Sequence, residues 1–186
     1  MKFKSTSIPD VFVIEMKRIE DERGVFMETY KQRDFKAATG VDPEFVQDNF
    51  SLSKAKNTIR GLHFQAPPFA QGKLVRCLRG SILDVAVDIR IGSPTFLRSV
   101  TVELSQKNAK QLWIPEGFLH GFRTLAPDTE VAYKCTQYYS PEHDGSILWN
   151  DAGLAVDWGM TRGEISLSDK DNNAARFSDF DNPFYY

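Results

Sequence analysis

Four side chains in this chain could move protons between carbon and solvent. His63 lies in the strand-like run 59–65, and because histidine has a reference pKa of about 6.5 it is the natural general base. Tyr133 could donate a proton, and Lys73 could supply fixed positive charge. One carboxylate of the run 169–171 could orient His63, or the run could be a solvated charged surface; the spacing does not choose. Acid–base catalysis is therefore the first hypothesis.

Each of these residues also has an ordinary structural interpretation. A lone strand histidine is usually structural, a tyrosine often belongs to the core, and a lysine after a turn is usually solvated. Arg60 and Gln65 lie close to His63, and several polar groups in apolar strands favour a polar cavity inside a barrel. Strict alternation places Arg60 on the face opposite His63, unless Gly61 marks a β-bulge.

A metal site is the main alternative chemistry. Pro115-x-Gly117-x-x-His120 resembles the second motif of the cupin superfamily, many of whose members hold a metal. The first cupin motif usually supplies His-x-His, but here the sequence is His63-Phe64-Gln65, and glutamine is a poor transition-metal ligand. His143 lies in a turn-like stretch that we expect to be exposed. We therefore expect no catalytic metal.

Composition narrows the class of protein. The 186 residues include 23 Lys and Arg and 25 Asp and Glu, giving a net charge of −2, and 41% are hydrophobic. This balance indicates a globular chain and argues against a nucleic-acid or membrane partner. No apolar run of about 18 residues is present, and no signal peptide is expected. Cys77 and Cys135 lie in apolar runs and are typical of buried thiols in a cytoplasmic protein.

Period-2 hydrophobic patterns predict an all-β protein with little helix. We expect strands in residues 81–90, 99–104, 111–115, 118–125 and 130–138, with turns between them. One short helix is expected over residues 34–39, with Asp34 as its N-cap and Gly40 following its end. Short antiparallel strands favour a sandwich or barrel, and we expect one domain over residues 1–186. The tail after Pro141 should lie over the barrel as loops and short helical turns.

Ordered motif blocks run from about Ile8 to Asp171. They include Asp21-Glu22-Arg23-Gly24, Phe45-Val46-Gln47-Asp48-Asn49, Arg60-Gly61-Leu62-His63-Phe64-Gln65, Gln71-Gly72-Lys73-Leu74-Val75-Arg76, Trp113-Ile114-Pro115-Glu116-Gly117, Tyr133-Lys134 and Leu167-Ser168-x-Lys170-Asp171. In order and spacing they resemble the dTDP-4-dehydrorhamnose 3,5-epimerase family. The resemblance implies a cupin-type jelly-roll barrel with a few short helices.

The resemblance also implies a reaction of dTDP-L-rhamnose biosynthesis. The substrate would be dTDP-4-dehydro-6-deoxy-D-glucose and the product dTDP-4-dehydro-L-rhamnose. Both C3 and C5 lie beside the C4 ketone, so a carbanion at either carbon spreads onto oxygen as an enolate. Such an isomerase needs a base on one face, an acid on the other and positive charge at the oxygen, but no redox cofactor.

Residue roles follow from the same resemblance. His63 would abstract the proton, Asp171 would orient it, Tyr133 would return a proton and Lys73 would stabilise the enolate. The implied substrate-binding residues are Arg23, Arg60 and Lys170 for the diphosphate, Glu28, Gln47, Asp48, Asn49 and His120 around the nucleotide and sugar, and Phe26 and Tyr139 at the thymine ring. Asp144 is a further implied substrate-binding residue, and it stands where many relatives have glutamate. The family further implies a homodimer whose exchanged N-terminal strand carries Arg23, Phe26 and Glu28 into the partner's site.

Three other interpretations remain open from the sequence. A sister enzyme could epimerise only C3 or only C5 of a related nucleotide sugar with the same base and acid. A metal-dependent cupin oxygenase or isomerase would need a further ligand that Gln65 does not supply. A sugar-binding module would have no need for His63, Tyr133 and Asp171 together.

Overall fold

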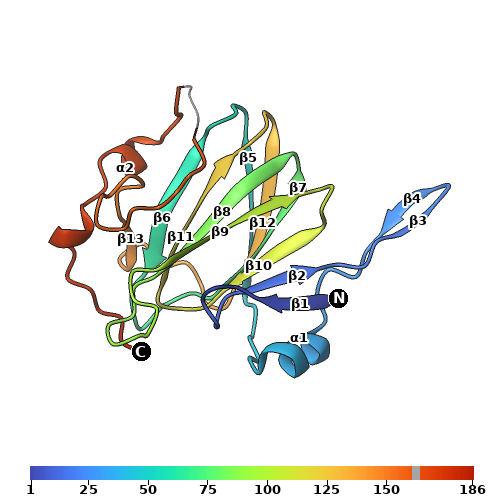
Figure 1. The fold of residues 1–186 in the computed structure, drawn as a ribbon, viewed down its shortest axis with the longest axis horizontal. Helices are drawn as coiled ribbons and strands as arrows, with labels where there is room; N and C mark the ends of the chain where they lie inside the picture. The colour runs from blue at the N-terminus through green and yellow to red at the C-terminus, as the bar shows by residue number, and fades with distance from the viewer. Residues whose placement is uncertain (161–163) are drawn as a thin grey trace.

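Two facing antiparallel sheets form the body of the protein (Figure 1). The computed structural model describes residues 1–160 and 164–186. The larger sheet has the order β1 (Lys2–Ser5), β2 (Phe12–Glu15), β10 (Lys110–Ile114), β7 (Lys73–Arg79), β12 (Thr129–Cys135) and β5 (Gln47–Ser53). The smaller has the order β13 (Asp144–Ser146), β6 (Ile59–Gln65), β11 (Phe118–Thr124), β8 (Ser81–Asp88) and β9 (Ser99–Ser105). The all-β prediction is confirmed, and each predicted strand is present. Two of them are shorter than predicted: β12 ends at Cys135 rather than at residue 138, and β8 ends at Asp88 rather than at residue 90.

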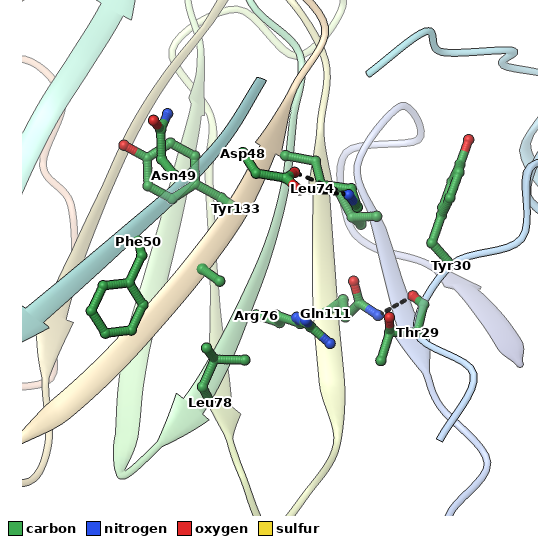
Figure 2. A pocket seen from close by; sticks show the side chains of 12 residues that line it. Thr29, Tyr30, Asp48, Asn49, Phe50, Leu74, Arg76, Leu78, Gln111 and Tyr133 are labelled. Atoms are coloured by element: carbon green, nitrogen blue, oxygen red, sulfur yellow. Dashed lines mark hydrogen bonds and ion pairs between the residues drawn. The ribbon is translucent and has the colours of Figure 1, made fainter. Parts of the chain in front are cut away.

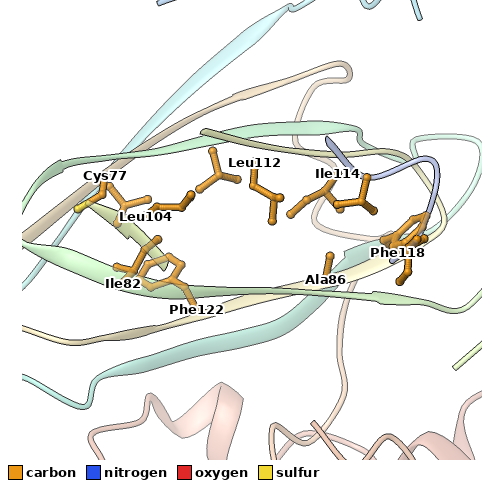
Figure 3. Packing of buried hydrophobic residues seen from close by; sticks show 12 residues of the cluster. Cys77, Ile82, Ala86, Leu104, Leu112, Ile114, Phe118 and Phe122 are labelled. Atoms are coloured by element: carbon orange, nitrogen blue, oxygen red, sulfur yellow. The ribbon is translucent and has the colours of Figure 1, made fainter. Parts of the chain in front are cut away.

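Alternating side chains from both sheets fill the space between them. Val75 and Cys77 of β7 belong to the same buried cluster as Ile82 and Ala86 of β8, and Phe122 of β11 completes this part of the core (Figure 3). Each large apolar side chain buried here contributes about 1.5–3 kcal/mol to folding. This apolar packing fixes the separation of the two sheets, and therefore the dimensions of any cavity between them.

The C-terminal segment covers the outer face of the smaller sheet. Leu62, Val85 and Val87 point to this face and pack with Trp158 and Phe184 from the tail. The tail includes the short helices α2 (Asp169–Asn172) and η1 (Phe177–Asp179), as expected for loops and helical turns laid over the barrel (Figure 1). No helix in the described ranges is long and apolar enough to span a membrane.

Helix α1 (Gln32–Thr39) covers part of the larger sheet's outer face. Buried Phe35 packs edge-on against Trp113, with ring centroids 5.3 Å apart. Gly40 adopts φ +75° after the last turn, as predicted. The prediction of Asp34 as N-cap is wrong: the helix begins earlier, Lys31 occupies the N-cap position without a side-chain hydrogen bond, and Asp34 lies in the first turn.

A two-stranded hairpin projects from the body (Figure 1). It consists of β3 (Ile19–Asp21) and β4 (Gly24–Phe26). Ile19, Val25 and Phe26 are exposed on it, and Phe26 keeps 68% of its surface accessible. The hairpin therefore presents apolar side chains that the described residues of its own chain do not cover.

A β-bulge at Gly61 changes the direction of the side chains along β6. On β11, His120 pairs with His63 and Phe122 with Arg60, so β6 contains one residue more than its partner between these pairs. Arg60 and His63 consequently line the same cavity, whereas Leu62 packs on the outer face. The strict alternation considered from sequence is wrong, and the bulge at Gly61 is confirmed.

Replacing Gly61 should disrupt both the fold and this cavity. The φ of Gly61 is +118°, and a Cβ there would lie 2.6 Å from the Cα of Gly121 and 2.7 Å from the carbonyl oxygen of His120. We expect Gly61→Ala to lower the free energy of unfolding by about 2 kcal/mol or more in urea denaturation. Gly92→Ala is the matched control, because Gly92 has φ +88° but open space around its Cβ position. Equal losses in the two variants would contradict the close-packing argument.

Candidate active site

A polar cavity of about 190 Å³ lies between the two sheets. It is lined by Ser51, Arg60, His63, Lys73, His120, Phe122, Tyr133, Ser168, Lys170 and Asp171. All four residues predicted to carry chemistry are therefore brought together. Three predicted binding residues, Arg60, His120 and Lys170, line the same cavity.

His63 and Asp171 form a close pair at the wall of the smaller sheet. His63 Nε2 lies 2.5 Å from Asp171 Oδ1, with the imidazole partly exposed and the carboxylate 3% exposed. Ser168 is the N-cap of α2; its Oγ donates to Asp171 Oδ2 at 2.9 Å and accepts from the Asp171 amide. Asp171, rather than Asp169, is thus the carboxylate that contacts His63.

The surroundings of Asp171 keep this carboxylate ionised. Burial alone would raise its pKa, but hydrogen bonds from His63 and Ser168, the charge of His63 and the Gly61 amide outweigh burial and lower the pKa. An ionised Asp171 orients the imidazole and stabilises the imidazolium form. One ring nitrogen is engaged by Asp171, which leaves the other for a substrate proton.

Tyr133 and Lys73 come from the larger sheet, on the opposite wall. They lie on β12 and β7, which pair with each other. Burial raises the pKa of the Tyr133 phenol, which keeps its proton available for donation. Burial also lowers the pKa of the Lys73 ammonium, an effect that the nearby carboxylates of Asp144 and Asp84 partly offset. The cavity therefore has an imidazole on one wall and a phenol with an amine on the other.

A second histidine–aspartate pair was missed from the sequence. His120 Nε2 lies 2.8 Å from Asp84 Oδ1, and both residues are buried. Burial raises the pKa of Asp84 and lowers that of His120. Asp84 Oδ2 has no hydrogen-bond partner among the described residues. The sequence did contain a signal for this pair, because Asp84 interrupts the apolar strand pattern of residues 81–90.

Two serines were also missed. Ser51 lines the cavity, and its buried hydroxyl has no partner within residues 1–160 and 164–186. Ser168 stands three residues before Asp171, a spacing typical of helix N-caps that interact with an acidic side chain. That capping signature could have selected Asp171 over Asp169.

A polar network lies beside the cavity. Asp144 Oδ2 accepts from Tyr139 OH at 3.1 Å and pairs with Lys170 Nζ. Across the cavity, Arg60 Nε donates to Ser53 Oγ at 3.1 Å. The three predicted binding residues Tyr139, Asp144 and Lys170 are thus joined to one another, and Lys170 connects them to the cavity.

The β5 residues divide between the two faces of the larger sheet. Asn49 donates to the Sγ of buried Cys135, and Gln47 donates to Asn49, so both lie on the inner face. Asp48 instead pairs with Lys134 at 3.0 Å on the outer face, in a hollow of about 300 Å³ (Figure 2). The structure therefore does not bring Asp48 into the cavity of its own chain.

Three predicted binding residues near the N-terminus lie away from the cavity. Arg23 and Phe26 line a separate hollow on the hairpin, where Arg23 pairs with Asp21. Glu28 pairs with Lys31 just before α1. Within the described residues of one chain, these side chains do not join His63 and Tyr133.

His63 and His120 each pair with one carboxylate, but these side chains do not form a metal-ligand cluster within the described residues. No group of three or more His, Cys, Asp or Glu side chains suited to a metal occurs in the described part of the chain. His143 is half-buried rather than exposed, as its Nδ1 contacts Ser140 Oγ at 2.8 Å and its ring packs on Phe69. The amide of Gln65 is engaged by backbone groups.

Comparison with known proteins agrees with the geometry. The family described as dTDP-4-dehydrorhamnose 3,5-epimerase matches residues 5–179. Curated enzymes of that name from Salmonella typhimurium and Shigella flexneri are 54% and 50% identical, covering 88% and 97% of this chain and 90% and 98% of their own.

A solved structure extends the similarity to three dimensions. It is a dTDP-6-deoxy-D-glucose-3,5-epimerase from Legionella pneumophila in complex with dTDP-4-keto-L-rhamnose, 45% identical, with a TM-score of 0.94 over 100% of this chain and 98% of that one. The predicted cupin-type jelly roll is confirmed. On the sequence match, the shared fold and the cavity together, the chain belongs to the dTDP-4-dehydrorhamnose 3,5-epimerase family.

Proposed function

We propose that this protein is a dTDP-4-dehydrorhamnose 3,5-epimerase, which converts dTDP-4-dehydro-6-deoxy-D-glucose to dTDP-4-dehydro-L-rhamnose. The observation that carries the proposal is the placement of His63 and Tyr133 on opposed walls of one cavity. Inversion at carbon requires that a proton leave one face and return to the other. The reaction transfers no electrons between substrate and enzyme, so a base and an acid suffice.

The proton steps balance with the groups in the cavity. The free ring nitrogen of His63 takes the proton from C3 or C5, and the C–H electrons move into an enolate on the C4 oxygen. Lys73 stabilises that oxygen, and Tyr133 delivers a proton to the opposite face of the carbon. Proton exchange with solvent restores imidazole and phenol before the second carbon reacts. Asp171 stabilises the imidazolium while it exists.

The nucleotide must lie outside the cavity. At about 190 Å³ it is smaller than the ~300–1,000 Å³ typical of small-molecule sites, so it holds the sugar and leaves the diphosphate and base towards the surface. We assign Arg60, Lys170, Asp144, Tyr139, Gln47 and Asn49 to contacts at the mouth of the cavity, and buried His120 to the sugar within it. Arg60 and Lys170 suit diphosphate oxygens because they are cationic.

A homodimer would complete the nucleotide site. The hairpin exposes Ile19, Val25 and Phe26, and it carries Arg23 away from its own cavity. We propose that it reaches the partner's cavity, where Arg23, Phe26 and Glu28 contact the nucleotide and Asp48 lies at the shared boundary. We also propose a cytoplasmic location, since Cys77 and Cys135 are buried and unpaired.

Deuterium exchange tests the chemistry directly. Proton NMR of the enzyme with dTDP-4-dehydro-6-deoxy-D-glucose in D2O should show deuterium entering at both C3 and C5. Because His63 is the base, His63→Ala should lower the exchange rate about 10²- to 10⁴-fold. Thermal melting and dTDP binding serve as controls for folding. Exchange at one carbon alone would make the protein a single-site epimerase, and full exchange in the variant would remove His63 as base.

The pH profile of kcat tests Lys73. Burial lowers the pKa of Lys73, so the ammonium should lose its proton at a lower pH than an ordinary lysine. We therefore expect kcat to fall at a pH below about 10.4, the usual lysine pKa. Lys73→Arg, if it retains turnover, should move this loss to higher pH, since guanidinium stays charged, and Lys73→Met should be impaired at every pH. An unchanged kcat and alkaline limb in Lys73→Met would refute the role.

Mixing two inactive variants tests the shared site. Arg23→Ala and His63→Ala should each be impaired, whereas co-refolded mixtures should recover up to about a quarter of wild-type activity, because half of randomly formed dimers contain one intact site. Recovery requires that Arg23 act in the partner's cavity. Absence of recovery despite confirmed heterodimers would place Arg23 in its own site or outside both.

A further inference from the structure

Gln65, at the end of β6, has every polar group of its side chain engaged although it is only 5% exposed. Its Nε2 donates to the carbonyl oxygens of Phe69 and Tyr138, the latter at 2.9 Å. Its Oε1 accepts from the backbone amide of Ser140 at 2.9 Å. One side chain therefore connects β6 to two loops that are remote from each other in sequence.

The second of these loops depends on side chains for its backbone hydrogen bonds. β12 ends at Cys135, and the segment 138–140 follows outside the sheet. Gln65 binds the carbonyl of Tyr138 and the amide of Ser140, and Gln47 Oε1 accepts from the amide of Tyr139 at 2.8 Å. Fixing this segment requires a group that can donate and accept at the same time.

A carboxamide of this length meets that requirement. Glutamine offers two N–H donors and an acceptor oxygen, whereas glutamate would direct oxygen at two carbonyls and methionine would leave all three groups unbound. A histidine at position 65 would present only two ring nitrogens. The residue found where metal-binding cupins supply a ligand is here used entirely for loop attachment.

The attached segment carries Tyr139 to the edge of the cavity. Tyr139 is 56% exposed, and its hydroxyl donates to Asp144, which pairs with the cavity residue Lys170. Asp144 is itself held opposite Gln65 in the β13–β6 pairing. Gln65 therefore holds the backbone on either side of Tyr139, Gln47 holds its amide, and Asp144 holds its hydroxyl.

We propose that Gln65 is a positioning residue that fixes the segment 138–140 and thereby sets the affinity for the nucleotide part of the substrate. It takes no part in proton transfer, because the Nε2 and Oε1 atoms of its side chain are hydrogen-bonded to backbone groups. This inference rests on the proposed function, because it assigns Tyr139 to the nucleotide.

The first test separates binding from turnover. We expect Gln65→Met, of similar length but without hydrogen bonds, to raise KM and the dTDP dissociation constant about tenfold, with kcat changed less than about threefold. Gln71→Met is the matched control: Gln71 donates one bond, to the carbonyl of Gln137 at 2.8 Å, and forms no hydrogen bond with residues 138–140 in the described part of the chain. It should leave KM and dTDP binding near wild type. A loss of kcat with unchanged KM would overturn the proposal.

A double-mutant cycle tests whether Gln65 acts through Tyr139. If it does, Gln65→Met should add little to the KM of Tyr139→Ala, because the side chain it positions is already absent. Additive effects on KM would show that Gln65 acts by another route and would refute the assignment.

Hydrogen–deuterium exchange provides a readout that needs no substrate. The amides of Tyr139 and Ser140 should exchange faster in Gln65→Met than in the wild type, and at the wild-type rate in Gln71→Met. Unchanged exchange in Gln65→Met would overturn the attachment itself. A third outcome separates the two proposals: amide exchange rises in Gln65→Met, but the wild type neither binds dTDP nor epimerises the substrate. The proposed function then fails, and with it the effect of Gln65 on nucleotide affinity, whereas the attachment of the loop by Gln65 stands.

Discussion

The single extra residue in β6 is the constraint on which the site depends. Side chains of a strand alternate between two faces, so a regular β6 would send Arg60 and His63 to opposite sides of the smaller sheet. The bulge at Gly61 changes that parity and turns both towards the larger sheet, while Leu62 still packs beneath the tail. Glycine is required because of the positive φ and the close approach of β11.

The space between the sheets has two uses that compete physically. Apolar side chains such as Val75 and Phe122 fill one part of this space and hold the sheets together. The other part, the polar cavity, contains ionisable groups, whose burial costs free energy unless they are paired. Asp171 is paired with His63 and Ser168, and Asp84 with His120. These fixed pairs preorganise the cavity for a reaction that develops charge.

Proton transfer is assigned to the sheets, whereas recognition is divided between the sheets, the loops and the hairpin. The residues proposed for proton transfer lie on strands or are held against a strand, where position is determined by the ladder hydrogen bonds. Of the residues proposed for the nucleotide, Tyr139 lies on a loop and Arg23 on the projecting hairpin, whereas Arg60, Gln47 and Asn49 lie on strands of the two main sheets. Loop backbone needs side-chain partners to be ordered, and Gln65 and Gln47 provide them for the segment 138–140.

The sequence by itself determined the strand-rich fold class, because period-2 patterns such as residues 81–90 record which side chains are buried. It also supplied His63, Tyr133 and Lys73 as chemical candidates. Only the tertiary structure decided that Gly61 is a bulge and that Asp48 faces away from the cavity. It also showed the contact between His63 and Asp171, which the family resemblance implied but residue spacing could not choose over Asp169. Each of these depends on hydrogen bonds and packing between segments far apart in the chain, such as those of His63 and Asp171, which are 108 positions apart. Local spacing carries no information about such partners.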